Sequence, residues 1–108
     1  MKNAEIMNME LSNLVTTCKK MNLLSLIKLS NHAYDLYYEK YHEMRRCLSI
    51  LKSDDVGKLI KVQYDPIYKE LKNELPIIWR KYEIIALEIG EKFLKQIGIT
   101  DRLIFNNL

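Results

Sequence analysis

Residues 33–46 read AYDLYYEKYHEMRR, and they carry four of the seven tyrosines of this 108-residue chain within eight positions. The apolar pattern in this stretch continues beyond it at alternating spacings of three and four residues, for nearly three heptads. Its members are Tyr34, Tyr37, Tyr41, Met44, Leu48 and Leu51. Such spacing places side chains on one face of an α-helix, and we predict that this face is the buried seam of a helical bundle.

The opposite side of the same predicted helix is polar. It carries His32, Asp35, Glu39, His42, Arg46 and Ser49. Glu39 and His42 reproduce the Glu-x-x-His spacing of di-iron helical bundles, but such a site needs a second pair and two further glutamates directed into the core. The chain has two histidines, both on this polar side. We therefore expect a solvated face with no metal or other cofactor, and a surface metal shared by two copies of the helix is the alternative.

The composition predicts a single all-α domain. The chain contains three glycines and two prolines, 48% of its residues are hydrophobic and 29% are charged. So few turn-forming residues favour long helices over a β fold with many turns. A chain of this length can also bury a core without disulfides or metal. We predict a small bundle of four or five helices with a long, apolar C-terminal helix.

The approximate helix bounds follow from apolar spacing and capping residues. They are 9–29, 31–52, a short segment at 55–63, 66–75 and 77–97, with a tail at 98–108. Ser30 or Asn31 is expected to cap the second helix, while a restart capped by Asn22 is an alternative for the end of the first. Pro66 suits the first position of a helix. Pro76 is expected to break or sharply kink the chain, because proline removes a backbone donor.

The stretch 77–97 has the clearest helical periodicity in the chain, and Gly98 follows it as a candidate C-cap. The main apolar face comprises Ile78, Tyr82, Ile85, Ala86, Ile89, Phe93 and Ile97. Ile84, Leu87 and Leu94 lie away from this face, among charged residues. They predict a second contact surface for another chain or for a second copy of this one. Packing by the C-terminal tail is the alternative use of these residues.

The net charge is +3, and the whole excess lies in residues 1–53, while residues 54–108 are neutral. An excess this small permits an acidic partner without requiring one. Tyr38 lies beside the apolar seam, where its ring can stay accessible for stacking on a base. A nucleic-acid surface would combine this ring with nearby cations, and direct DNA or RNA binding is the alternative function. The candidate set is Tyr38, Arg45, Arg46, Lys52, Lys58 and Lys61.

Sequence motifs for catalysis are missing. The chain has no glycine-rich phosphate loop, no Gly-x-Ser-x-Gly elbow and no paired-cysteine metal motif. Cys18 lies on an apolar stripe, and His42 points to a different side of its helix from Cys47, so no cysteine–histidine pair is expected. There is no secretory signal and no apolar stretch long enough for a membrane span. We therefore expect two free, buried thiols in a cytoplasmic protein.

These observations favour docking over catalysis. We expect a non-enzymatic helical interaction protein, a small subunit or adaptor that binds itself or a partner protein. The basic first half makes a nucleic-acid-associated assembly one setting for it. No catalytic residue is expected, and Ile84, Leu87 and Leu94 are the expected partner-binding residues.

Overall fold

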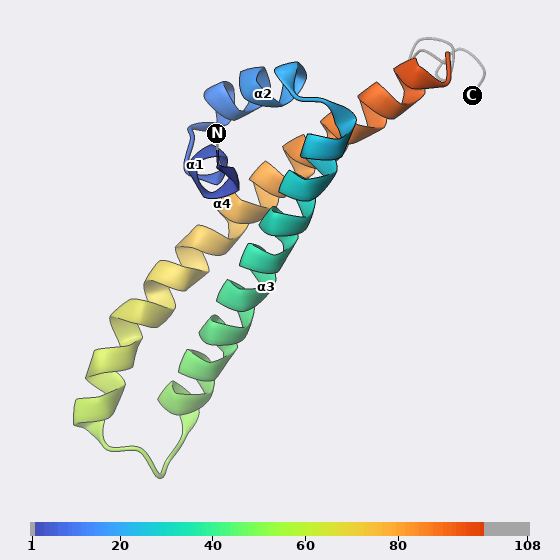
Figure 1. The fold of residues 1–108 in the computed structure, drawn as a ribbon. Helices are drawn as coiled ribbons and strands as arrows, with labels where there is room; N and C mark the ends of the chain where they lie inside the picture. The colour runs from blue at the N-terminus through green and yellow to red at the C-terminus, as the bar shows by residue number, and fades with distance from the viewer. Residues whose placement is uncertain (1, 99–108) are drawn as a thin grey trace, which may run out of the picture.

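Two long antiparallel helices form the body of the molecule. The computed structural model describes residues 2–98, which contain four α-helices and no strand. The helices are α1 (Asn3–Met7), α2 (Leu11–Lys20), α3 (Leu23–Lys52) and α4 (Lys58–Gln96). α3 and α4 form a hairpin joined by residues 53–57, and α1 and α2 lie beside the half farthest from that connection (Figure 1). The all-α prediction is confirmed for this part of the chain.

The start of α3 is set by Asn22. Its side-chain Oδ1 accepts a hydrogen bond from the backbone N–H of Ser25 at 2.8 Å, as an N-cap residue does. Met21, just before it, has an extended backbone that ends α2. The predicted helix 9–29 is therefore divided here, and its second part joins the predicted helix 31–52. The restart at Asn22, which was the alternative, is what the structure contains.

The second half of the chain forms one helix of 39 residues, α4. It covers most of three predicted segments, 55–63, 66–75 and 77–97. The helix continues through both Pro66 and Pro76, so the predicted break at Pro76 is wrong. A proline inside a helix costs about 3 kcal/mol, but Leu75 and Ile78 are buried on either side of Pro76. Their packing offsets the lost hydrogen bond and keeps the helix continuous.

The C-terminal end of α4 is closed by a glycine, as predicted. Gly98 has a φ of 80°, which lies in the left-handed region that glycine adopts without strain. Its N–H donates to the carbonyl oxygen of Lys95 at 3.2 Å, and this bond satisfies one of the carbonyls left free at a helix end. The rest of the predicted tail, 99–108, lies outside the described residues.

The hydrophobic core lies where α1 and α2 pack on the hairpin. It consists of Ile6, Met7, Leu14, Cys18, Leu26, Leu29, Ala33, Ile78 and Ile85. In the other half of the hairpin, residues 42–74, the buried side chains are Cys47 and Leu71; we call this half the arm. Both cysteines are free and buried, as predicted. The radius of gyration is 18.7 Å, against about 13 Å for a compact domain of this length, because the arm extends away from the core.

The buried line of α3 differs from the predicted seam. Its buried residues are Leu26, Leu29, Ala33 and Cys47. Five residues of the predicted seam are half-buried, namely Tyr37, Tyr41, Met44, Leu48 and Leu51. Tyr34 is 42% exposed, so its assignment to the core is wrong. α1 and α2 cover the flank of α3 that carries Leu29 and Ala33, and this cover moves the buried line away from the tyrosines.

Two lysines of α4 hold the short helices in place. The Lys81 Nζ donates to the carbonyl oxygen of Met7 at 2.6 Å, and the Lys92 Nζ donates to the carbonyl oxygen of Lys19 at 2.8 Å. Each acceptor lies in the last turn of its helix, where carbonyls lack intrahelical partners and the helix dipole favours a cation. The side of α4 that carries Lys81 and Lys92 therefore faces α1 and α2.

Candidate functional site

A cluster of six aromatic rings joins α3 to α4. It consists of Tyr34, Tyr37, Tyr38 and Tyr41 of α3 with Trp79 and Tyr82 of α4. Two contacts cross between the helices: the ring centroids of Tyr37 and Trp79 are 5.0 Å apart, and those of Tyr34 and Tyr82 are 5.9 Å apart. These separations and tilted ring planes are typical of favourable aromatic pairs. The cluster therefore contributes to the pairing of the two long helices.

The outer rings of this cluster are exposed. Tyr34 is 42% exposed, Tyr38 41% and Trp79 40%, while the other three rings are half-buried beneath them. The Tyr34 and Tyr38 centroids lie 4.6 Å apart. Two further exposed residues, Ile27 of α3 and Phe93 of α4, extend the apolar surface toward the end of the hairpin. We call the surface formed by Ile27, Tyr34, Tyr38, Trp79 and Phe93 the aromatic face.

The aromatic face lies on the side of the hairpin that α1 and α2 leave uncovered. On α4, the residues that face α1 and α2 follow one helical line: Lys81, Ile85, Glu88 and Lys92. Trp79 and Phe93 are fourteen residues apart and share a different line, since residues seven apart lie on the same side of a helix. Ala86 and Gly90 occupy that line between them, and both are exposed. The small helices therefore cover one side of α4, and the aromatic face lies on another.

The side chains of the aromatic face were only partly found by sequence reasoning. Phe93 belonged to the predicted buried face, yet it is 53% exposed. The pairs Tyr34–Tyr82 and Tyr37–Trp79 set the register of the hairpin, and this register places Phe93 opposite Leu23, the first residue of α3. The C-terminal end of α4 projects beyond the start of α3 (Figure 1), so at this register Phe93 has no long helix against it. Trp79 was left out of the predicted apolar face, although it shares a helical line with Ala86 and Phe93, two members of that face.

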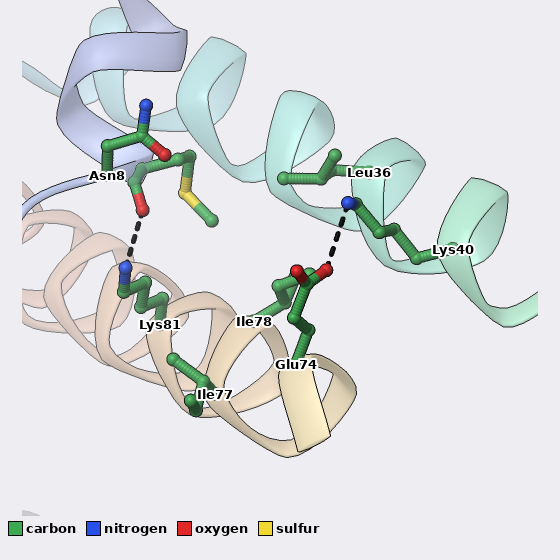
Figure 2. Close-up of a pocket in the computed structure, with 8 residues that line it drawn as sticks. Asn8, Leu36, Lys40, Glu74, Ile77, Ile78 and Lys81 are labelled. Atoms are coloured by element: carbon green, nitrogen blue, oxygen red, sulfur yellow. Dashed lines mark hydrogen bonds and ion pairs between the residues drawn. The ribbon is translucent and has the colours of Figure 1, made fainter. Parts of the chain in front are cut away.

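A shallow groove of about 330 Å³ lies at the junction of α1, α3 and α4 (Figure 2). Its lining includes Leu36, Ile77 and Ile78. Two ordered polar contacts cross it: the Lys40 Nζ lies 2.9 Å from the Glu74 Oε2, and Lys81 donates to Met7. The hydrogen bond to Glu74, opposed by partial desolvation, raises the pKa of Lys40. Both lysines are already paired within the chain, so the groove offers no free cation to an anionic ligand.

The three predicted partner-binding residues do not form one free stripe. Ile84 packs against the core on the side of α1 and α2. Leu94 is half-buried, and Leu87 is 65% exposed next to the line of Trp79 and Phe93. Internal packing thus accounts for Ile84, and Leu87 remains available beside the aromatic face.

The predicted nucleic-acid set is spread along α3 and the first turn of α4. Tyr38, Arg45, Arg46, Lys52 and Lys58 are exposed, and Lys61 is half-buried. Tyr38 and Arg45 are seven residues apart on one side of α3. Tyr38 and Lys52 are separated by about 21 Å along the same helix. One compact site does not contain them all, and Arg45 is the cation on the side of Tyr38.

Within residues 2–98, no group of three or more histidine, cysteine or acidic side chains is placed to hold a metal ion. None of the helices in this same range is both long enough and apolar enough to traverse a bilayer.

The described residues therefore define an elongated α-helical hairpin, covered on one side by two short helices and carrying an aromatic face on the other. No protein-family model matches the chain, and no curated protein or solved structure matches it significantly.

Proposed function

We propose that this chain is a non-enzymatic helical interaction protein that docks onto a protein partner through the aromatic face. The observation that carries the proposal is the exposure of three rings of one aromatic cluster: Tyr34, Tyr38 and Trp79 are each close to two-fifths exposed on an uncovered side of the hairpin. Isolated exposed apolar residues are normal on a protein surface. Contiguous aromatic ones are enriched at the centres of protein interfaces, where tyrosine and tryptophan contribute most to binding.

The packing of the rings also suits a docking role. Tyr34 contacts both Tyr38 and Tyr82, and Trp79 contacts Tyr37 and Tyr82. Rings held in this way lose little side-chain freedom when a partner covers them, which lowers the entropic cost of association. A preorganised aromatic surface on two long helices is therefore a suitable contact for another helical protein.

The chemistry of the remaining polar groups favours docking over catalysis. Cys18 and Cys47 are buried, so neither thiol is presented to a substrate. Burial, reinforced by the nearby charge of Glu88, also raises the pKa of the Cys18 thiol and keeps it protonated. The lysines of the groove are paired with acceptors of the chain itself.

Photo-crosslinking in the native host tests the docking proposal. Tyr38 is replaced by a benzophenone amino acid in the full chain, and Leu59, which is 84% exposed on the arm, receives the same replacement as a matched control. We expect a discrete protein adduct from position 38 and none from position 59. Equal adducts from both positions, or none from position 38, would contradict docking through the aromatic face.

Direct DNA or RNA binding is the second candidate, and one observation favours it. The exposed ring of Tyr38 and the exposed Arg45 share one side of α3, so a base could stack while the guanidinium contacts phosphate. This function requires affinity for a labelled single-stranded oligonucleotide that falls steeply with salt, because phosphate contacts release counterions. Anisotropy that stays flat at low salt would exclude it.

A further inference from the structure

We infer that the partner of the aromatic face is a second copy of this chain, and that two hairpins pack face to face into an antiparallel four-helix bundle. This inference rests on the docking function proposed above and names its partner. Four-helix bundles bury apolar lines from each member helix in a shared core. In this chain α3 and α4 supply two of those helices, with their apolar line uncovered on the side away from α1 and α2.

The exposed apolar area is large enough for such a dimer. The aromatic face and its neighbours Leu87 and Ile97 are seven residues that are 40% to 65% exposed. With roughly 150–250 Å² for a fully accessible aromatic side chain and less for an aliphatic one, they leave about 600 Å² uncovered. Two such surfaces bury about 1,200 Å², at the lower bound for a specific interface before any polar rim is counted.

Gly90 gives an independent indication of close approach from outside the chain. Glycine inside a helix is unfavourable relative to alanine by about 1 kcal/mol, and its missing side chain lets another group approach the backbone closely. A Cβ placed on Gly90 would meet nothing within 4 Å, and the residue is exposed. Among residues 2–98, therefore, no side chain or backbone occupies the space beside Gly90. That space lies on the line of Trp79 and Phe93, where an approaching ring can occupy it.

The positions of Trp79 and Gly90 fit a two-fold arrangement. In a symmetric dimer, the same surface patch must be complementary to itself. When α4 packs antiparallel on α4 of the second copy, with the axis midway between these two residues, each Trp79 ring lies over the partner's Gly90. The same axis passes α3 near residue 31, which brings Tyr34 and Tyr38 of one copy toward the partner's Ile27. The projecting ring of Trp79 and the bare backbone of Gly90, eleven residues apart, are thus complementary to their counterparts across a single two-fold axis.

Trp79 is the sole tryptophan of the chain, so its fluorescence reports directly on the proposed interface. The wild-type chain is measured by light scattering after size exclusion and by tryptophan emission over a dilution series. We expect a mass twice that of the 12.9 kDa chain, and a red shift of Trp79 emission as dilution separates the copies. The Gly90→Leu variant should raise the dimer dissociation constant at least tenfold with its helical circular dichroism retained, because leucine is a good helix former. Leu59→Glu on the arm is the control and should leave dimerisation unchanged.

Three results would overturn the inference. A strict monomer up to about millimolar concentration excludes a second copy; the crosslink at position 38 then decides separately whether docking to another protein survives. A dimer that Gly90→Leu leaves intact, with Trp79 emission unchanged on dilution, places the interface elsewhere. A monomer whose Trp79 emission is quenched by an oligonucleotide assigns the face to nucleic acid instead.

Discussion

At the scale of single residues, Asn22 determines where α3, the long helix of the first half of the chain, begins. Its Oδ1 accepts the backbone N–H of Ser25, while Ser30 and Asn31, the caps expected from spacing, lie inside α3. The side-chain hydrogen bond of Asn22 stabilises a new helix start at this position, in place of a helix that continues from α2. Two asparagines nine residues apart therefore have different roles, one as a cap and one as an exposed interior residue.

Replacing Asn22 with alanine should lower the free energy of unfolding by about 1 kcal/mol, because the cap at the start of α3 is lost. Asn31→Ala, in the exposed interior of the same helix, is the matched control. It should be neutral or slightly stabilising, since alanine is the better helix former. Urea unfolding followed by circular dichroism measures both variants. Equal losses in the two variants would mean that Asn22 has no special capping role.

The Cys18 thiol should make the fold less stable at alkaline pH. Burial, with the charge of Glu88 adding to it, raises the pKa of this thiol above its ordinary value of 9.0, and Lys92 opposes the shift. Below pH 9 the thiol is protonated in both states, so its contribution to stability is fully present. Above pH 9 the unfolded chain releases its proton first, and stability is lost as the pH rises toward the pKa of the folded state.

Urea unfolding between pH 8 and pH 10.5 measures this dependence. Cys18→Ala should show a shallower decline of the unfolding free energy with pH than the wild type. Leu14→Ala truncates a side chain in the same core without removing a titratable group, and it should keep the wild-type slope while lowering stability throughout. A Cys18→Ala slope equal to that of Leu14→Ala would refute the assignment.

At the scale of elements, α4 remains a single helix despite two prolines. Pro66 and Pro76 are both exposed, so their rings point to solvent and the carbonyls left without a donor can bond to water. Leu71, Leu75 and Ile78 are buried against α3 on both sides of Pro76. Tertiary packing thus outweighs a local preference that, taken alone, ends a helix.

Pro76→Ala should raise the free energy of unfolding by about 1–3 kcal/mol, because it restores a backbone donor and removes a steric clash within α4. Glu91→Ala, also an exposed change inside α4, is the control, and it should alter stability by only a few tenths of a kcal/mol. Thermal and urea unfolding of both variants provide the measurement. A destabilised Pro76→Ala would show that the proline itself has a structural role in the helix.

At the scale of the whole molecule, the buried side chains are concentrated at one end. The core cluster lies where four helices meet, whereas the arm buries only Cys47 and Leu71 among residues 42–74. Several large apolar side chains of the arm, including Leu59 and Val62, are strongly exposed. A two-helix arm with so few buried contacts should open locally at a lower free energy than the core.

Amide hydrogen exchange measures this difference directly. Amides of the core segments 26–33 and 78–85 should exchange at least tenfold more slowly than those of the arm segments 44–51 and 62–70. Both pairs of segments lie within α3 and α4, so the comparison holds secondary structure constant. Uniform protection along the two helices would contradict a stability gradient and would indicate that the arm is covered in solution.

The sequence by itself predicted the helical character of the described residues and the burial of both cysteines. It also predicted Asn22 as a possible helix cap and Gly98 as the residue that ends the last helix. Each depends on spacing, capping or side-chain polarity within a few residues, and those effects are readable in order along the chain. The apolar spacing on α3 also predicted approximately which side of the helix is covered, because five of the six residues of the predicted seam are half-buried.

Tertiary contacts decided which of two neighbouring stripes became core. α1 and α2 pack over the flank with Leu29 and Ala33, so Tyr34, Tyr38 and Trp79 stay exposed. The continuity of α4 likewise depends on its packing against α3. The exposure of Phe93 depends on where α3 begins. Adjacent stripes on a helix surface are made of residues next to one another in sequence. Only the position of the helices packed against them determines which stripe is buried. The aromatic face therefore exists as a surface only in the folded chain.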